Sequence, residues 1–262
     1  MVLSDKQTLV STRFDEHGKQ GRVARLTIER AAKLNTLNPA AVADLTAAAN
    51  ALQTDDRLRA VVLTGAGDRS FVGGADVYAM AGFDADAAEA FITALHRAIA
   101  AVRAIPVPVI ARVNGYCLGA GLELAAGCDL RVASDNAVFG MPEVKVGIPS
   151  VIEAALLPHL IGWGKTAELL YLGENIDAVA ARDCRLIDKL VPAAELDGAV
   201  DRWLHALLEA GPRAVRLQKA LVRQWETLAL PQAIEAGIRS FRAAYGTDEP
   251  RQMMASFVNR RR

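Results

Sequence analysis

The chain has 262 residues, with 30 basic and 30 acidic side chains, and its formal net charge is therefore zero. A neutral chain has no overall field that attracts nucleic acid or an acidic membrane, so a few local groups must hold any anionic ligand. Hydrophobic residues make up 52% of the sequence, enough for a large buried core. Three cysteines, Cys117, Cys128 and Cys184, form no CxxC pair, and their odd number favours a reducing cytoplasm.

The first residues, MVLSDKQTLV, lack a basic region followed by an apolar run, so we expect no secretory signal. Residues 105–128 form the most apolar stretch, but Arg112, Asn114 and Glu123 interrupt it. A membrane span needs about 20 predominantly apolar residues, so none is expected.

The first half of the chain alternates between patterns typical of strands and of helices. VARLTIER (residues 23–30) has the period-two spacing of a half-buried strand. Asn38 and Pro39 are suited to the N-cap and first position of a helix. AVVLTGAG (60–67) then reads as a buried strand that ends in a glycine loop, and a long helical pattern follows Phe83 and stops before Pro106.

The second half begins with another strand, VIARVNG (109–115), a glycine-rich turn and the apolar helix LELAAG (122–127). Two short strands are predicted within 129–134 and 137–140, and the pattern is almost wholly helical from Val151 onward. The sequence therefore predicts an α/β core followed by a helical C-terminal region.

Two glycine turns can present unpaired backbone N–H groups. In SFVGGADVYAM (70–80), Ala75 and Asp76 begin a helix after two glycines, and in NGYCLGAGLELAAGCD (114–129) three glycines surround the start of another. Such N–H groups can donate to an oxygen that develops negative charge during a reaction. A plain turn before a helix is the alternative explanation of each segment.

Two glutamates have apolar neighbours. Glu123 lies on the apolar helix, where burial is expected to raise the pKa of its carboxyl, although it can also simply stabilise the helix N-terminus. Glu143 follows Pro142 in FGMPEVKVGIPSV (139–151), and a solvent-facing loop glutamate is the alternative. Taken together, two donor turns and two such glutamates suit a site that polarises a carbonyl and moves protons beside it.

These three segments, in this order and at this spacing, resemble the crotonase superfamily and most closely its enoyl-CoA hydratases. ERAAKLNTLN (29–38) and the ending DEPRQMMASFVNRR are also similar to that family, so the resemblance covers most of the chain. It implies a spiral of ββα units in residues 1–195, with the coenzyme A and acyl site. It further implies a helical region in residues 196–262 for trimerisation and closure of the site.

The resemblance also implies roles for individual residues. Ala75 and Ala120 match the two backbone donors of the oxyanion hole, although the family often has glycine at the second position. Glu123 and Glu143 match the two hydratase carboxylates, with Glu123 chiefly the base and Glu143 the acid. The substrate-binding stretch would comprise Lys33, Gly74, Ala75, Asp76, Val77, Tyr78 and Ala120. Tyr78 replaces a common lysine, so a side-chain contact to coenzyme A is in doubt there, and Lys33 can also be an ordinary surface lysine.

The activity implied by the resemblance is syn addition of water to a 2-trans-enoyl-CoA. Coenzyme A is then part of the substrate, no separate cofactor is expected, and the four scattered histidines predict no metal site. The family's assembly implies a homotrimer or homohexamer. Isomerisation of a 3-enoyl-CoA, hydration of a specialised acryloyl-CoA, and RNA binding remain alternatives, although ARLTIERAAKLN lacks the basic face that RNA would require.

One segment departs from the family. SVIEAALLPHLIGWG (150–164) stands where many hydratases have a glycine-rich run, in the region expected to meet the acyl chain. The size and polarity of the acyl group therefore stay open. Glu153 in this segment either begins a helix or makes an additional polar contact to the substrate.

Overall fold

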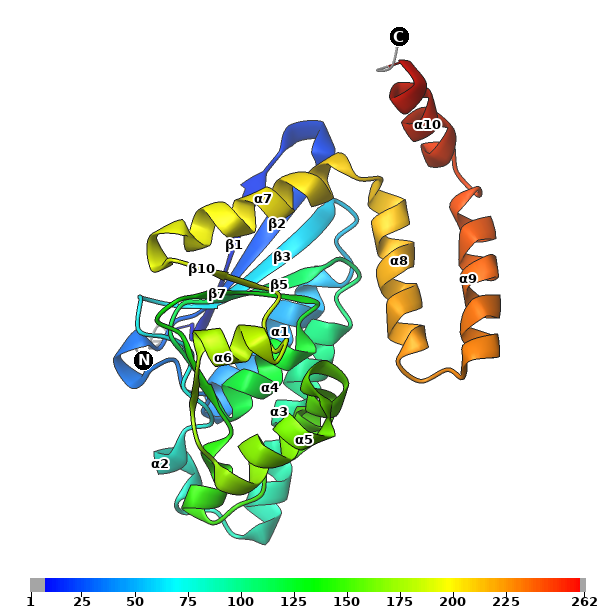
Figure 1. Ribbon diagram of the computed structural model, residues 1–262. Helices are drawn as coiled ribbons and strands as arrows, with labels where there is room; N and C mark the ends of the chain where they lie inside the picture. Colours follow the sequence, from blue (N-terminus) through cyan, green and yellow to red (C-terminus); the bar gives the residue numbers. More distant parts are fainter. Residues whose placement is uncertain (1–7, 260–262) are drawn as a thin grey trace, which may run out of the picture.

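The computed structural model describes residues 8–259 and contains two β-sheets flanked by helices (Figure 1). The larger sheet has six strands in the order β1-β2-β3-β5-β7-β10. Only β1 and β2 are antiparallel, and the other pairs are parallel. These strands are β1 (Val10–Glu16), β2 (Arg22–Ile28), β3 (Leu58–Gly65), β5 (Val109–Val113), β7 (Leu130–Ser134) and β10 (Lys189–Val191).

The smaller sheet has the order β4-β6-β8-β9, and only its β8–β9 pair is antiparallel. Its strands are β4 (Ser70–Val72), β6 (Tyr116–Leu118), β8 (Val138–Gly140) and β9 (Ile176–Asp177). Each of the first three follows a longer strand of the larger sheet after a short connection. This succession of two strands and then a helix is the repeated ββα unit that the resemblance implied.

Helices cover both faces of the larger sheet. The extensive apolar core contains residues of α1 (Pro39–Leu52), α3 (Ala85–Arg103) and α4 (Ala120–Gly127). On the other face, α7 (Leu196–Glu209) packs against the side chains of Val23, Val62, Ile110 and Val132. Residues after 195 are therefore helical as predicted, but their first helix completes the core of the sheet.

The remaining helices lie around these layers. They are α2 (Val77–Met80), α5 (Leu157–Leu172), α6 (Ala178–Asp183), α8 (Pro212–Trp225), α9 (Leu230–Ala244) and α10 (Glu249–Asn259). The described part of the chain also contains five short 3₁₀ turns: η1 (Gly18–Gln20), η2 (Ala31–Lys33), η3 (Pro142–Val146), η4 (Ile152–Leu156) and η5 (Ala193–Glu195). Among the described residues, no helix is both long and apolar enough to cross a membrane.

Several local predictions are confirmed. The Asn38 side chain caps α1 by accepting a hydrogen bond of 2.9 Å from the N–H of Ala41, and Pro39 begins the helix. The prediction of an almost wholly helical pattern from Val151 onward was incomplete, because β9 and β10 interrupt it. Two or three residues are too short for a strand periodicity to be visible in the sequence. The two regions that the resemblance implied, residues 1–195 and 196–262, include residues 1–7 and 260–262, which lie outside the described residues.

A partly buried ionic cluster joins α8 to the core. The ammonium of Lys219 donates to the carbonyl of Val107 and to Asp129 Oδ2, both at 2.8 Å. Arg223 donates to the other oxygen of Asp129 at 2.9 Å. Burial lowers the pKa of Lys219, although the charge of Asp129 opposes this. Asp129 therefore holds two cations of α8 against the start of β7.

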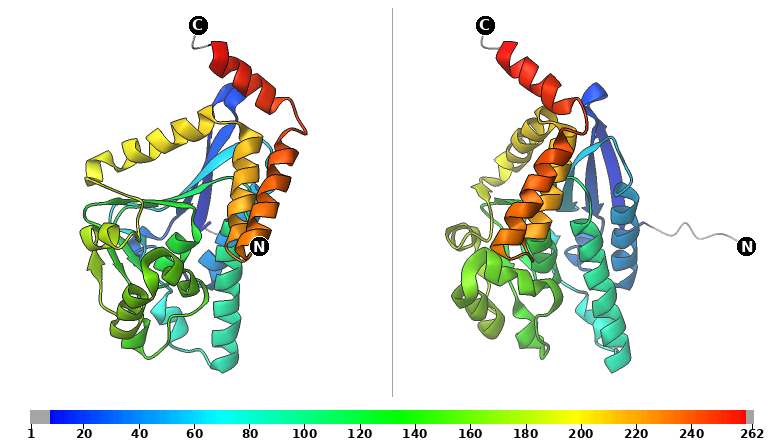
Figure 2. Two further views of the ribbon diagram at one scale, coloured as in Figure 1. Left: turned by 45° about the vertical axis from the view of Figure 1, so that its right-hand side comes forward. Right: turned by 90° about the vertical axis from the view of Figure 1, so that its right-hand side faces the viewer.

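The last two helices extend away from the sheets. Figure 2 shows α9 lying alongside α8, with α10 beyond it. The outer face of α9 has exposed large apolar side chains at helical spacing, namely Leu230, Ile234, Ile238, Phe241 and Tyr245. An apolar stripe of this length is unusual on a surface that faces only water.

Candidate active site

The two glycine turns lie side by side because the strands before them are paired. β4 and β6 are parallel neighbours, with Val72 opposite Cys117, so both strands end at the same edge of the smaller sheet. A Cβ atom built on Gly74 would lie 3.3 Å from the carbonyl oxygen of Leu118. One built on Gly121 would collide with the carbonyl oxygen of Val72. The turns therefore approach each other closely, and the glycines make this approach possible.

Each turn contains a backbone N–H without a partner in the described part of the chain. Leu37 forms a parallel bridge with the turn, bonding to the carbonyl of Gly74 and the N–H of Asp76. The N–H of Ala75, between them, consequently points away from Leu37. Ala120 is the first residue of α4, where the N–H cannot have an intrahelical acceptor, and the N-cap Gly119 offers no side chain. Both predicted oxyanion donors are thus structurally free to bind a ligand oxygen.

Glu123 lies in the first turn of α4 and is only 4% exposed. Its Oε1 accepts a hydrogen bond of 3.1 Å from the N–H of Ala154. Burial raises the pKa of Glu123 to about 8, opposed by the Ala154 hydrogen bond and supported by the charges of Glu143 and Glu153. The carboxyl therefore holds its proton at neutral pH in the free protein, which is the raised pKa that the apolar sequence context predicted.

Glu143 reaches the same place from η3. Its Oε2 accepts a hydrogen bond of 2.8 Å from the hydroxyl of Ser150, which fixes the carboxylate. The other oxygen, Oε1, lies directly against Gly119, where it would collide with any Cβ atom at that position. Gly119 also has a φ of 51°, in the region that favours glycine. Glycine at 119 therefore leaves free the space that the carboxylate oxygen occupies, and it suits the backbone conformation of the turn.

A cavity of about 300 Å³ lies in front of these groups. Its lining includes Ala75, Gly119 and Glu143, together with apolar side chains such as Met80 and Ile148. Glu123 does not line this cavity but lies just behind Gly119, close enough to Glu143 for their charges to interact. The structure thus brings together two free N–H groups and two carboxyls, which sequence reasoning had placed in one site.

The predicted substrate-binding residues around Tyr78 range from buried to exposed. Tyr78 is 90% exposed and Val77 is also exposed. The ammonium of Lys33 lies 6.0 Å from the centroid of the Tyr78 ring, a distance at which a cation and an aromatic ring attract each other. Gly74 lines the cavity below them. Lys33 and Tyr78 are therefore neighbours, and their predicted role in substrate binding stays a prediction.

Asp76 has a structural task that the sequence did not reveal. Its carboxylate accepts hydrogen bonds from the N–H of Ala79, as the N-cap of α2, and from Arg30 at 2.9 Å. Burial raises the pKa of Asp76, but these hydrogen bonds outweigh burial and hold it below its usual value. Arg30 also donates to the carbonyl and hydroxyl of Thr36. Arg30 was missed because its contact with Asp76 joins residues 46 positions apart.

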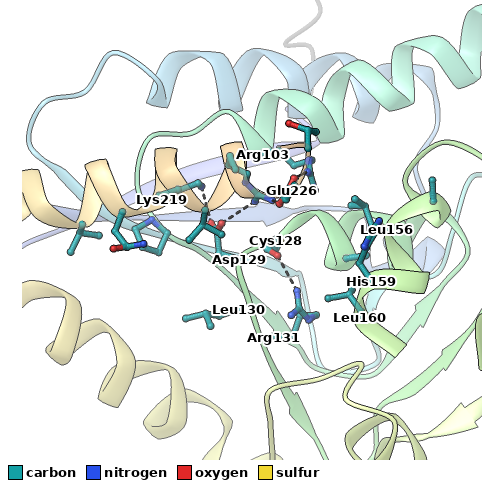
Figure 3. Close-up of a pocket in the computed structure, with 18 of the residues that line it drawn as sticks. Arg103, Cys128, Asp129, Leu130, Arg131, Leu156, His159, Leu160, Lys219 and Glu226 are labelled. Carbon is teal, nitrogen blue, oxygen red and sulfur yellow. Dashed lines mark hydrogen bonds and ion pairs between the residues drawn. The ribbon is translucent and has the colours of Figure 1, made fainter. Parts of the chain in front are cut away.

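A larger cavity of about 790 Å³ lies elsewhere, between the end of α4, α5 and α8 (Figure 3). The Asp129 cluster forms one wall, and Leu156, His159 and Leu160 form another. None of the predicted catalytic residues lines it. Within residues 8–259, no group of three histidine, cysteine or acidic side chains is arranged to hold a metal ion.

Comparison with known proteins identifies the family. The sequence profile of the enoyl-CoA hydratase/isomerase family matches residues 18–262. The chain is 32% identical over 245 residues to the short-chain-enoyl-CoA hydratase of Clostridium acetobutylicum, covering 93% of this chain and 94% of that protein. It is 34% identical to the crotonyl-CoA hydratase of Syntrophomonas wolfei, with the same coverage of both chains.

The fold agrees with solved structures. The crystal structure of an enoyl-CoA hydratase from Bacillus anthracis has a TM-score of 0.90 and 27% identity, covering 95% of this chain and 96% of that one. That from Mycobacterium smegmatis has a TM-score of 0.91 at the same identity, with 97% coverage of both chains. The chain therefore belongs to the enoyl-CoA hydratase/isomerase family, and the predicted crotonase fold is confirmed.

Proposed function

We propose that the chain is an enoyl-CoA hydratase, a hydro-lyase that adds water to a 2-trans-enoyl-CoA in syn fashion to give a 3-hydroxyacyl-CoA. The observation that supports this most is the meeting of two carboxyls, Glu123 and Glu143, at a turn that presents a free N–H group. The relatedness to short-chain-enoyl-CoA and crotonyl-CoA hydratases supports the same reaction. A coenzyme A thioester is the substrate in this proposal, and no separate cofactor is needed.

The N–H groups of Ala75 and Ala120 would bind the thioester oxygen. Their hydrogen bonds withdraw electrons from the double bond, which makes Cβ electrophilic, and they stabilise the enolate-like charge that develops. A water molecule held between the two carboxyls attacks Cβ. The ionised carboxyl accepts a proton from this water, and the protonated carboxyl delivers one to Cα, so water is added with no net change in the protein.

The proton of the pair rests on Glu123 in the free protein, because its pKa is raised to about 8. A protonated Glu123 is suited to act as the acid, which is opposite to the sequence-based assignment of Glu123 as the chief base and Glu143 as the acid. Two interacting carboxyls titrate as a unit. We therefore assign the acid and base roles to the pair and not one role to each member.

The activity itself is tested with crotonyl-CoA. We expect loss of absorbance at the enoyl thioester band when the protein is added, and formation of 3-hydroxybutyryl-CoA. An isomerase would instead create this band from a 3-enoyl-CoA. Salt-dependent retention of RNA without turnover would favour a binding protein. Retention of two carboxyls favours hydration, because proton shuttling in an isomerase can work with one.

We expect the kcat/KM for crotonyl-CoA to fall as the pH rises through about 8. Above this pH Glu123 loses its proton, and a pair with two negative charges lacks the acid that protonates Cα. The measurement is kcat/KM between pH 6 and 10 at constant ionic strength, because this quantity reports the ionisation of groups in the free enzyme. A profile that is flat through this range would contradict the assignment of the resting proton.

Replacement of Ala120 by proline is expected to lower kcat by about 10²–10³-fold. Proline is accepted at the first position of a helix, where its missing N–H forms no intrahelical bond, so α4 should persist. The substitution therefore removes the proposed oxyanion donor and puts the ring Cδ in the place of the N–H hydrogen, so it also narrows the space for the substrate oxygen. Ala120→Gly keeps the N–H and is the matched control, with near-normal kcat. Equal kcat values for the two variants would refute the role of this N–H.

We further propose a homotrimer or homohexamer in the cytoplasm. The exposed apolar stripe of α9 supports an assembly, because burial against other copies would remove it from water. The cytoplasmic location is supported by Cys117, Cys128 and Cys184, which form no disulfide. Light scattering after size-exclusion chromatography distinguishes one, three and six copies of a chain of 27.9 kDa.

A further inference from the structure

Two segments that are distant in the sequence run side by side at the first donor turn. Residues 34–37 lie along residues 73–76, and three backbone hydrogen bonds of 2.8–2.9 Å join them. Ala75 lies opposite Leu37 in this short parallel bridge, and its N–H is the proposed first oxyanion donor. The direction of this N–H therefore depends on how the two segments are held together.

The guanidinium of Arg30 bonds to both segments. It donates to the carbonyl of Thr36 and, at 3.1 Å, to the hydroxyl of the same residue, which precedes Leu37. It also donates to Oδ2 of Asp76, the residue after Ala75, at 2.9 Å. Arg30 thus joins the two segments through residues adjacent to the Leu37–Ala75 bridge.

The backbone of Arg30 is itself fixed by a buried side chain. Asn35 is 0% exposed, its Oδ1 accepts a hydrogen bond of 3.0 Å from the N–H of Arg30, and its own N–H donates to the carbonyl of Arg30 at 2.9 Å. The side-chain amide of Asn35 donates to the carbonyls of Ala66 and Ser70 at 3.0 and 2.8 Å. Asn35 has a φ of 54°, a left-handed conformation in which asparagine is more common than most residues. The guanidinium therefore extends from a well-defined base.

The ion pair between Arg30 and Asp76 is shielded from water. The two side chains are 13% and 12% exposed, against 51% and 62% for the surface pair Arg182–Asp183. Screening by solvent is therefore weaker at Arg30. A planar guanidinium can bond to several partners in a fixed geometry, whereas an ammonium is a single point charge. Arginine at this position can hold both segments at once, and lysine is expected to hold only one.

We propose that Arg30 is a positioning residue of the oxyanion hole, which aims the N–H of Ala75 at the thioester oxygen by joining Thr36 to Asp76. Arg30, Thr36 and Asp76 do not line the cavity, so the guanidinium acts through the backbone of the turn. A donor stabilises a developing negative charge only when it is aimed at the place that the oxygen takes. A displacement of about 1 Å can lower the rate about 10²-fold. The role rests on one part of the proposed function, the binding of the thioester oxygen by Ala75.

The aim of the donor is measured with butyryl-CoA that carries carbon-13 at the thioester carbonyl. This saturated ligand cannot be hydrated, so infrared difference spectra of its complex with the full-length protein record the carbonyl stretch in the bound state. Hydrogen bonds to the oxygen lower this frequency. Arg30→Met is expected to remove about half of the wild-type shift or more, because one of the two donors is no longer aimed at the oxygen. Arg182→Met, at the exposed pair, is the matched control and should leave the shift unchanged.

Turnover of crotonyl-CoA provides a second readout. Arg30→Met should lower kcat by about 10–100-fold, with KM changed by less than about threefold, because the hydrogen bond strengthens as negative charge develops. Arg30→Lys keeps a positive charge beside Asp76 and should recover part of both kcat and the carbonyl shift. A role confined to folding would instead lower the fraction of folded protein and leave the shift of the bound ligand as it is in the wild type.

The two measurements distinguish the role of Arg30 from the proposed function. A wild-type protein that does not hydrate crotonyl-CoA would remove the hydratase assignment, while the carbonyl shift of butyryl-CoA would still decide the role of Arg30. A wild-type shift in Arg30→Met would overturn the positioning role. If Arg30→Met does not fold, Arg30→Lys decides alone, since a shift equal to that of the wild type would show that joining both segments is not needed. No shift in the wild type would also overturn the proposal, because the turn would then present no donor to the ligand.

Discussion

Glu143→Gln and Glu123→Gln are each expected to reduce the kcat for hydration of crotonyl-CoA by about 10²–10⁴-fold. Glutamine is nearly isosteric with glutamate, so the contact of residue 143 with Ser150 and that of residue 123 with Ala154 can persist. Neither amide, however, can accept or deliver the proton that hydration requires. Initial rates at saturating substrate measure the effect. The exposed Glu168→Gln variant is the control, and near-normal turnover by either active-site variant would defeat the proposed mechanism.

Glu123→Gln should also stabilise the fold at high pH. A carboxyl whose pKa is raised from its usual value to about 8 binds its proton more tightly in the folded state. The free energy of unfolding of the wild type therefore decreases as the pH rises from the usual glutamate pKa to about 8. The amide of Glu123→Gln does not titrate, so the variant does not show this decrease. Thermal unfolding at pH 5 and pH 9 should show a larger gain for the variant at pH 9. Such a gain together with lost activity is typical of a functional residue.

Asp129→Ala is expected to lower the free energy of unfolding by about 3–5 kcal/mol, the cost of removing one partner from a buried ion pair. The ammonium of Lys219 and the N–H of Val109 both donate to Asp129 Oδ2. The change removes this shared acceptor and leaves the buried ammonium without its carboxylate partner. Urea unfolding at one fixed protein concentration measures the loss. Replacing Lys219 by methionine in the same chain should recover part of it, because the unpaired charge is then absent.

The matched control for Asp129 is Asp183→Ala. Asp183 also pairs with an arginine, but both side chains of that pair are exposed. Exposed pairs contribute at most about 1 kcal/mol. Similar losses for Asp129→Ala and Asp183→Ala would show that the cluster does not hold α8 against the core.

The parts of the site that could be predicted from the sequence are those defined by neighbouring residues. The Asn38-Pro39 start of α1, the glycine turns and the apolar surroundings of Glu123 are all local patterns, and the order of the motifs placed them in one family. The predicted strand at 109–115 and helix after Phe83 are present for the same reason, as β5 and α3.

Contacts between distant parts of the chain could not be predicted in this way. Arg30 meets Asp76 across 46 positions, and His96 meets Glu153 across 57. No local pattern of charge indicates such partners, because they follow from the pairing of strands and the packing of α3 against η4. The pairing of β4 with β6, which brings the two donor turns together, is likewise a property of the folded sheet.

The fit between Gly119 and the Glu143 carboxylate has an evolutionary consequence. Because the acid occupies the space beside the glycine, substitutions at these two positions are not independent. A descendant that replaces Glu143 with a smaller residue gains space beside residue 119, but the φ of 51° still strains any side chain there, and one that first acquires such a side chain displaces the Glu143 carboxylate. Glycine at position 119 is therefore expected to outlast the loss of Glu143 in such descendants, because the backbone conformation favours it whether or not the carboxylate is present.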